Sequence, residues 1–255
     1  MRSNSRATRT LVFVAPFFSH AALAHGLPGD ERVELESNGW RLVGEWRSAE
    51  SDTELAPAAL LLHRAAGSRA EYAKLAQELA KRGVASLRLD LRGNGESDNL
   101  GRFEEPYQEN LWILERTYED IDVALRWMAA RPGIDSARRA AVGASYSGEA
   151  IGEALRHGGE RASAYVILSP GSFSEESIAA VDASGVPWLF IRTSEESEVS
   201  LEFIDAVFEA LASQSKSAEV RVIAGAGHAT RIFDEHPFII QEVAEWLAER
   251  LGAKP

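Results

Sequence analysis

Short apolar runs alternate along this chain with longer segments in which apolar residues recur every three or four positions. The first two predicted strands, Arg32–Leu35 and Trp40–Trp46, flank the dipeptide Asn38-Gly39. Asn-Gly is favoured in two-residue hairpin turns because both residues accept a positive φ. We therefore expect the fold to open with an antiparallel hairpin.

The apolar runs that follow are short and almost unbroken, which is typical of strands buried on both faces of a sheet. They are Ala58–His63, Val84–Leu89, Arg139–Val142, Ala164–Leu168, Trp188–Ile191 and Val220–Ile223. Such runs, separated by helical segments, indicate a mostly parallel sheet with helices on both faces. The prediction is an α/β fold of about eight strands, with the antiparallel hairpin at one edge.

The helical segments carry start signals and apolar stripes of their own. Ser68-Arg69-Ala70-Glu71 matches a capping box before a helix through Leu79. A long amphipathic helix is expected from Asn110 to Met128, and three more over 147–157, 201–211 and the C-terminal stripe 240–251. The acids on the long helix are interpreted as a solvated face; they are Glu115, Glu119, Asp120 and Asp122.

The first 24 residues have the pattern of a secretory signal peptide. Three arginines and no acid precede the apolar run Leu11–Ala24, which ends in the small-x-small sequence Ala22-Leu23-Ala24. An uncleaved membrane anchor is the alternative, but the run is short for a membrane span. We expect cleavage after Ala24, a single domain over residues 25–255, no membrane contact after cleavage, and a periplasmic or secreted protein.

Composition narrows the possible functions. The formal charge of −12 disfavours nucleic acids and anionic membranes as partners. The chain has no cysteine, which excludes disulfides, a thiol nucleophile and a thiolate metal site. No histidines stand at metal-ligand spacing, so we expect neither a metal nor a cofactor. The expected assembly is a monomer or a small homo-oligomer.

Three groups with catalytic potential follow predicted strands. Ser145 lies in Gly143-Ala144-Ser145-Tyr146-Ser147-Gly148, at a strand-to-helix junction typical of a nucleophile elbow. The acids Glu195 and Glu196 follow a later strand, and His228 follows the next, within Gly225-Ala226-Gly227-His228. In parallel sheets chemistry gathers at the carboxyl ends of strands. The order serine, acid, histidine therefore predicts a hydrolytic triad.

Further motifs resemble those of the α/β-hydrolase family, from about Arg32 to the C-terminus. His63-Arg64-Ala65-Ala66-Gly67 is similar to the family's oxyanion loop, and Asp90-Leu91-Arg92-Gly93-Asn94-Gly95-Glu96-Ser97 to its signature after the next strand. The short link between Leu168 and Val186 leaves little room for a lid. The chain therefore resembles compact, capless members such as dienelactone-hydrolase-like proteins and small serine esterases.

The resemblance implies roles for individual residues. Ser145 would be the nucleophile, His228 the general base and Glu196 the residue that orients the imidazole. Glu195 and Glu198 remain alternatives for the acid. The backbone N–H groups of Tyr146 and Ala65 would hold the oxyanion, with Arg64 as second choice for the latter. His63 would buttress the loop.

Two departures from the family pattern leave questions open. Arg64 stands where the family has glycine, and its side chain could narrow the pocket, attract an anionic substrate or lie flat on the surface. The acid is a glutamate, which keeps the chemistry but has a longer side chain. In the elbow, Ser147 stands in the place of the second glycine as a small substitute. The expected activity is cleavage of small carboxylic esters through an acyl-enzyme. Thioesterase, amidase or lipase-like activity, or a non-catalytic binding protein on the same scaffold, are the alternatives.

Overall fold

The apolar runs form the strands of one twisted eight-stranded sheet in a computed structural model that describes residues 28–196 and 198–254. The strand order is β1-β2-β4-β3-β5-β6-β7-β8. The hairpin strands pair antiparallel, β2 joins β4 antiparallel, and the other strands are parallel. The bounds are β1 Glu31–Ser37, β2 Trp40–Arg47, β3 Ala56–Leu62, β4 Ala85–Leu89, β5 Ile134–Ala144, β6 Ala164–Leu168, β7 Trp188–Glu195 and β8 Ala218–Ala226.

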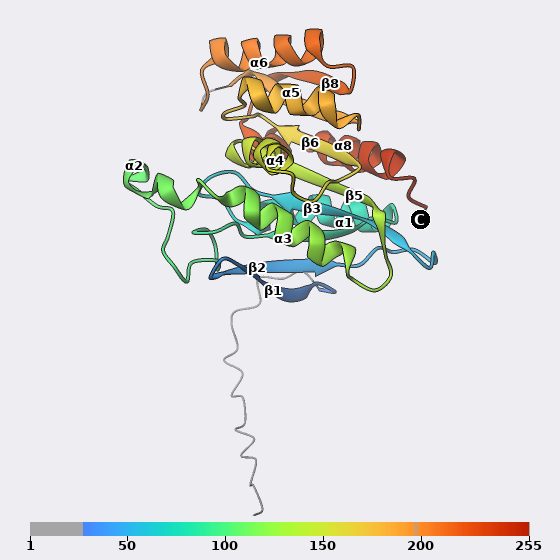
Figure 1. Cartoon of the computed structure of the whole chain (residues 1–255). Helices are drawn as coiled ribbons and strands as arrows, with labels where there is room; N and C mark the ends of the chain where they lie inside the picture. Colours follow the sequence, from blue (N-terminus) through green and yellow to red (C-terminus); the bar gives the residue numbers. More distant parts are fainter. Residues whose placement is uncertain (1–27, 197, 255) are drawn as a thin grey trace, which may run out of the picture.

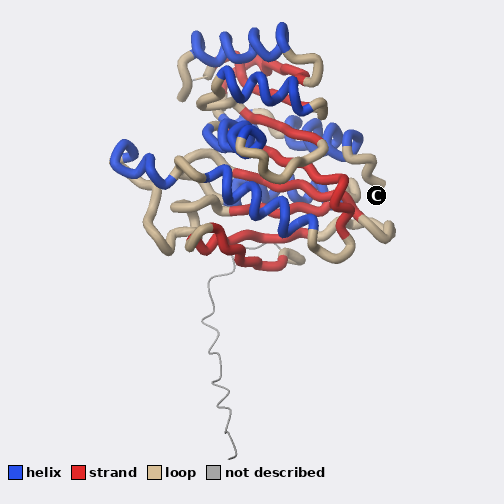
Figure 2. Tube along the Cα trace, in the orientation of Figure 1, coloured by secondary structure: helices blue, strands red, loops and turns tan. Residues whose placement is uncertain are grey.

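Helices cover both faces of this sheet, as Figures 1 and 2 show. Their bounds are η1 Arg69–Tyr72, α1 Ala73–Lys81, α2 Tyr107–Asn110, η2 Leu111–Ile113, α3 Thr117–Ala129, α4 Tyr146–Arg156, α5 Glu175–Ser184, α6 Leu201–Gln214, η3 Ala229–Arg231, α7 Ile232–Glu235 and α8 Phe238–Arg250. Helices α3 to α6 lie on the near face in Figure 1, and α1 and α8 lie behind the sheet. The predicted α/β architecture with an antiparallel hairpin at one edge is therefore confirmed.

Each face of the sheet has its own apolar core. On β3, Leu60 and Leu62 pack in the core beneath α3 to α6, whereas Leu61 packs in the core beneath α1 and α8. Successive strand side chains point to opposite faces, so a strand covered on both sides needs an unbroken apolar run. This requirement explains why the central strands were recognisable from sequence.

The hairpin turn follows the chemistry of its two residues. Asn38 has φ of 49° and Gly39 has φ of 84°, so both occupy the left-handed region that a type I′ turn requires. The register pairs Ser37 with Trp40 across the turn. The predicted hairpin is confirmed, and it ends the sheet on the N-terminal side.

Three expectations about helices were wrong in detail, and one helix was not expected. The Ser68 side chain makes no capping hydrogen bond to η1. The long helix does not begin at Asn110, because Leu111 and Trp112 lie in η2 and are about half exposed. Asp120 is buried, not solvated, because it pairs with Arg92. Helix α5 was not expected, since its segment carries no strong apolar stripe.

The predicted signal peptide, residues 1–24, and the start of the predicted domain at residue 25 lie outside the described residues. Within the part of the chain that is described, no helix is long and apolar enough to cross a membrane.

Candidate active site

The nucleophile elbow places Ser145 in a conformation that few residues adopt. Ser145 follows β5 with φ of 54° and ψ of −121°, and α4 begins at the next residue. A side chain at Gly148 would lie 2.7 Å from Ile167 of β6, so the glycine lets α4 pack closely on the sheet. Backbone strain of this kind persists only where surrounding contacts impose it. The sharp turn leaves the Ser145 hydroxyl at the carboxyl end of the sheet.

Ser147, the unexpected residue of the elbow, has a structural role. Its hydroxyl oxygen accepts a hydrogen bond from the Ala144 backbone N–H at 2.7 Å and lies 3.0 Å from the Leu62 carbonyl oxygen of β3. The side chain is fully buried. A serine can therefore replace the glycine because its hydroxyl ties the elbow to the neighbouring strand.

His228 reaches the nucleophile from the loop after β8. Its Nε2 lies 3.0 Å from the Ser145 Oγ, and its Nδ1 lies 2.8 Å from the Glu196 Oε2. With a proton on Nδ1 donated to the carboxylate, Nε2 keeps a lone pair for the serine hydroxyl proton. The imidazole is thus held in the tautomer that general-base chemistry requires.

The structure brings only one of the three candidate acids to His228. Glu195 is the last residue of β7 and is exposed, opposite Ala226 of β8. Glu198 is also exposed and forms an ion pair with Arg231. Glu196 is buried beside the imidazole, because the β7–β8 register shifts between Thr193 and Glu195 and turns the next side chain inward.

The two backbone N–H groups expected to hold the oxyanion have no protein acceptor among the described residues. Tyr146 is the first residue of α4 and Ala65 lies in the loop after β3; within residues 28–196 and 198–254 neither N–H donates to a protein acceptor. The N–H of Arg64, the second choice, is equally free among those residues. Free N–H groups at a helix start and in a loop suit a developing oxyanion.

His63 supports this loop from inside the protein. Its Nδ1 donates to the Arg64 carbonyl oxygen at 2.6 Å, and its Nε2 accepts from the Leu91 N–H at 3.0 Å. Complete burial lowers the pKa of His63, which favours the neutral ring that this acceptor role needs. His63 therefore links the loop after β3 to the turn after β4.

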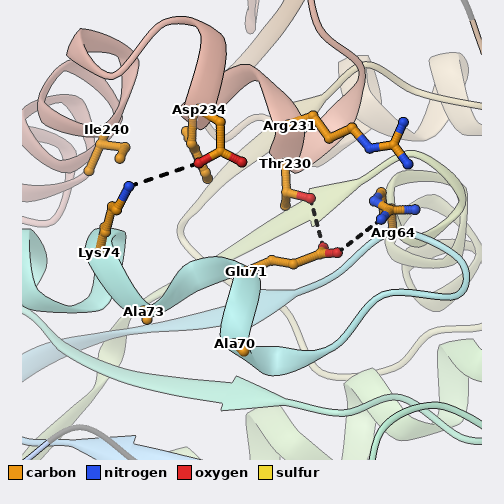
Figure 3. A pocket seen from close by; sticks show the side chains of 10 residues that line it. Arg64, Ala70, Glu71, Ala73, Lys74, Thr230, Arg231, Asp234 and Ile240 are labelled. Atoms are coloured by element: carbon orange, nitrogen blue, oxygen red, sulfur yellow. Dashed lines mark hydrogen bonds and ion pairs between the residues drawn. The ribbon is translucent and has the colours of Figure 1, made fainter.

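The Arg64 side chain lines a cavity of about 460 Å³, together with residues of η1, α1 and the segment that follows His228 (Figure 3). Its Nη2 lies 3.3 Å from the Glu71 Oε1, and the Thr230 hydroxyl donates to the Glu71 Oε2 at 2.7 Å. Gly67 admits this carboxylate, since a Cβ there would lie 2.8 Å from both of its oxygens. Glu71 thus joins the loop after β3 to η3, the turn that follows His228, and does not form the expected capping box.

The signature after β4 forms a buried ionic clamp. The Asp90 carboxylate accepts the Arg69 N–H at 2.7 Å and the Glu96 N–H at 2.9 Å, and it pairs with the Arg69 guanidinium. Gly95 has a positive φ, and a Cβ there would lie 2.0 Å from the Asp90 Oδ2. Glycine is required at this position for both reasons. The motif therefore shapes the turn and supplies no group to the nucleophile.

The phenol of Tyr146 packs against the core. Its oxygen is buried, and burial raises the pKa of this phenol well above its usual value. The side chain packs in the core beneath α3 to α6, while the Tyr146 backbone opens α4. Its backbone N–H, which has no acceptor among the described residues, stays the candidate oxyanion donor.

The other two histidines of the described segment, His157 and His236, have local partners. His157 stacks on Tyr118 at 4.2 Å between ring centroids, and the His236 Nε2 lies 3.0 Å from the Ala226 carbonyl oxygen. Among the described residues, no group of three or more histidine or acidic side chains could hold a metal ion.

Sequence reasoning missed Ser169 and Gly171, which follow β6. The Ser169 hydroxyl donates to the Glu196 Oε1 at 2.5 Å, and Gly171 lies directly beside the Ser145 Oγ. Their position just after an apolar run, between the strands of the nucleophile and the acid, is the one sequence signal that could have singled them out.

No family model and no curated protein matches this sequence. Solved structures do match its fold. The esterase Est1E of Butyrivibrio proteoclasticus, with bound ferulic acid, is 18% identical with a TM-score of 0.69, over 86% of this chain and 99% of that one. Esterase 2 of Thermogutta terrifontis, phosphoramylated by tabun, is 18% identical with a TM-score of 0.68, over 88% and 96%.

A third match is the Pyrococcus furiosus esterase PF2001, which is 16% identical with a TM-score of 0.67 over 87% of this chain and 91% of that one. At such low identity the likeness establishes the fold. Together with the strand order, the elbow and the helices on both faces, these matches show that the chain has the α/β-hydrolase fold.

Proposed function

We propose that this protein is a serine hydrolase that cleaves carboxylic esters through an acyl-enzyme. The observation that carries the proposal is the continuous hydrogen-bond chain from the Ser145 Oγ through His228 to Glu196, with distances of 3.0 and 2.8 Å. The esterases among the structural neighbours, one of them modified by an organophosphate, add support.

The proposed reaction has two halves. The Ser145 Oγ attacks the ester carbonyl carbon while His228 Nε2 takes the hydroxyl proton, and the oxyanion accepts hydrogen bonds from the Tyr146 and Ala65 N–H groups. The intermediate collapses, and the imidazolium gives its proton to the departing alkoxide. Water then attacks the acyl-enzyme with His228 as base, releasing the acid and restoring Ser145.

Glu196 stabilises the charged imidazole in both halves. Its carboxylate accepts the hydrogen bond from Nδ1 and fixes the ring orientation. Because the glutamate side chain is buried at the bond to His228, the interaction acts in a medium of low dielectric constant, where it is stronger than in water.

The short connection between β6 and β7 leaves little room for a lid, which favours small or medium esters over long-chain lipids. The whole connection between β6 and β7 consists of two short loops and α5, which is anchored to α4 because Ser174 and Ser177 donate hydrogen bonds to Glu149. A non-catalytic scaffold is disfavoured, since the Arg64 guanidinium contacts the Glu71 carboxylate and the Ala65 carbonyl oxygen, whereas the Ala65 N–H has no acceptor among the described residues.

A fluorophosphonate probe tests the proposal directly. The folded protein is expected to take up one equivalent of probe, to lose labelling in Ser145→Ala, and to hydrolyse p-nitrophenyl acetate and butyrate faster than longer esters. Heat-unfolded protein serves as the control for nonspecific labelling. Background hydrolysis across the whole ester series, together with no labelling, would overturn the assignment.

We also propose that the enzyme acts after export to the periplasm or the medium. The support is the arginine-led apolar segment that ends in Ala22-Leu23-Ala24. N-terminal sequencing of the protein from fractionated cells should find His25 as the first residue. A mature chain that keeps Leu11–Ala24 and sediments with membranes would contradict export as a free protein.

A further inference from the structure

The segment Leu168–Gly171, which ends β6, contacts both ends of the hydrogen-bond chain. The Ser145 N–H donates to the Leu168 carbonyl oxygen at 2.9 Å, which ties the elbow to β6. The Ser169 N–H donates to the Ile191 carbonyl oxygen of β7 at 2.7 Å, which ties the same segment to the strand of the acid. Because β6 lies between β5 and β7, this segment spans the gap between nucleophile and acid.

Ser169 holds the carboxylate of Glu196 from the side opposite His228. The Ser169 hydroxyl donates to Oε1 at 2.5 Å, and the His228 Nδ1 lies 2.8 Å from Oε2. Among the described residues each carboxylate oxygen therefore has one donor, and both donors are buried. A glutamate has one more rotatable bond than an aspartate, so an acid on this longer arm needs a second anchor to keep its plane aligned with the imidazole.

The backbone of Ser169 is shaped for this contact. Its φ is +41°, in the left-handed region that residues other than glycine, asparagine and aspartate seldom occupy. A hydroxyl-bearing residue is kept there although glycine would fit the backbone without strain. A positive φ held at a fully buried residue is the kind of local strain that occurs at functional sites.

Gly171 leaves the space that the nucleophile occupies. A Cβ at this position would lie 2.5 Å from the Ser145 Oγ and 3.6 Å from the Ser145 Cα. The backbone of Gly171 does not lie in the left-handed region, so its conformation permits any residue. What requires the glycine is therefore the position of the serine oxygen, because a methyl group would displace Oγ from its place beside His228.

We infer that Ser169 and Gly171 are positioning residues of the esterase site, Ser169 for the acid and Gly171 for the nucleophile. The inference rests on the proposed function. Ser169 keeps the Glu196 carboxylate facing the Nδ1 proton, and Gly171 keeps the Ser145 Oγ in the rotamer that reaches Nε2. The turn after β6 thus aligns the two ends of the hydrogen-bond chain, Ser145 and Glu196, which lie 51 residues apart in the sequence.

Two substitutions separate this role of Ser169 from a role in folding. Ser169→Ala removes the hydroxyl, and Ser169→Gly removes it while suiting the positive φ, so at least one variant folds. Both are expected to lower kcat about tenfold with KM changed less than twofold, since the loss of a hydrogen bond to a charged group acts on the step in which His228 becomes charged.

The matched control is Ser163→Ala at the other end of β6. The Ser163 hydroxyl donates to the Arg139 carbonyl oxygen at 2.9 Å, far from the triad, so this variant should keep the wild-type kcat. Ser169 variants with wild-type kcat, or Ser163→Ala with an equal loss, would overturn the positioning role.

A spectroscopic readout keeps the test independent of turnover. The proton NMR resonance of the His228 Nδ1–H, assigned by its absence in His228→Gln, reports the bond to Glu196. It should move or broaden in both Ser169 variants and stay in place in Ser163→Ala. If the wild type neither labels nor hydrolyses esters, the proposed function fails, while an unchanged resonance would refute the contact between Ser169 and the acid.

Gly171→Ala tests the nucleophile end. We expect the rate of fluorophosphonate labelling to fall about a hundredfold because the methyl group displaces Oγ from His228. Gly159→Ala adds the same methyl in a loop between α4 and β6, where the end of the Asp122 side chain lies 3.1 Å away, and should label normally. Labelling of Gly171→Ala at the wild-type rate would show that Oγ does not need this space.

Discussion

Two buried carboxylates follow strands on opposite sides of the nucleophile strand, and their partners differ. Asp90, after β4, pairs with the Arg69 guanidinium and accepts two backbone N–H groups. Glu196, after β7, accepts one hydroxyl and one imidazole N–H. Both carboxyl side chains are fully buried.

The difference lies in whether the partner can release a proton. A guanidinium is protonated at every pH at which the protein folds, so the Asp90 pair stays a fixed ion pair that shapes a turn. An imidazole can accept and release a proton, and the second nitrogen of His228 faces Ser145. A buried carboxylate therefore indicates chemistry when its partner also contacts a nucleophile. It indicates a structural role when its partner cannot release a proton.

Removing the charge of Glu196 is the strongest test of this contrast. Glu196→Gln should lower kcat/KM by about 10³–10⁴, because an amide cannot stabilise the imidazolium and favours the wrong tautomer. The matched variant Glu195→Gln, on an exposed side chain one residue earlier, should keep kcat/KM within a factor of three of wild type. The reverse pattern would move the acid to Glu195.

The corresponding change at Asp90 should affect stability and not chemistry. Asp90→Asn removes one partner of a buried ion pair and should lower the free energy of unfolding by about 3 kcal/mol, measured by urea denaturation. The activity per folded molecule should change little. Asp98→Asn, whose exposed pair with Arg102 contributes about 0.5 kcal/mol or less, is the control. An inactive but stable Asp90→Asn would contradict a purely structural role for Asp90.

Glu71 stands between the two cases, since it is a structural carboxylate that touches the site's supporting loops. Glu71→Gln keeps an acceptor for Thr230 but loses the ion pair with Arg64, and it should lower kcat/KM by a few fold. Glu71→Ala loses both contacts and should lower it about tenfold, or about 1.4 kcal/mol. Glu78→Gln is the control, because Glu78 pairs with Lys81 at the end of α1 and with Arg82 directly after it, and this variant should match wild type in the same ester assay.

The smallest expected effect concerns pH and His63. Burial lowers the pKa of His63, so below about pH 6.5 the unfolded chain binds a proton there that the folded chain does not. Stability should therefore fall as the pH drops below about 6.5, by at most about 1.4 kcal/mol per pH unit from this one proton. Denaturation series at pH 7.5 and 5.5 should show a smaller pH difference in His63→Gln than in wild type.

Local sequence patterns predicted most strands of the sheet and the nucleophile elbow of the site. Mostly apolar runs located β3, β4 and β6 to within two residues, because strands buried on both faces carry few polar residues; β4 is the exception, since it buries Ser86 and Arg88. The elbow was visible because its geometry excludes large side chains. Helix α5 was not visible, since it buries only a narrow part of its surface and its apolar spacing is weak.

Tertiary contacts overrode local interpretation at charged residues. The local sequence assigns Asp120 to a solvated helix face and Glu71 to a capping box. Their actual partners, Arg92 for the first and Arg64 with Thr230 for the second, come from other elements. A short-range pattern does not contain such partners, because they depend on which turns meet at the end of the sheet.

The sequence by itself determined which side chains stand at strand ends and in what order, and with them the class of fold. Only the tertiary structure decided that Glu196 and not Glu195 faces His228, that Arg64 pairs with Glu71, and that Ser169 and Gly171 border the triad. The physical reason is that strand alternation and burial are written in neighbouring residues, whereas register shifts and strand order determine which distant side chains come within hydrogen-bonding distance.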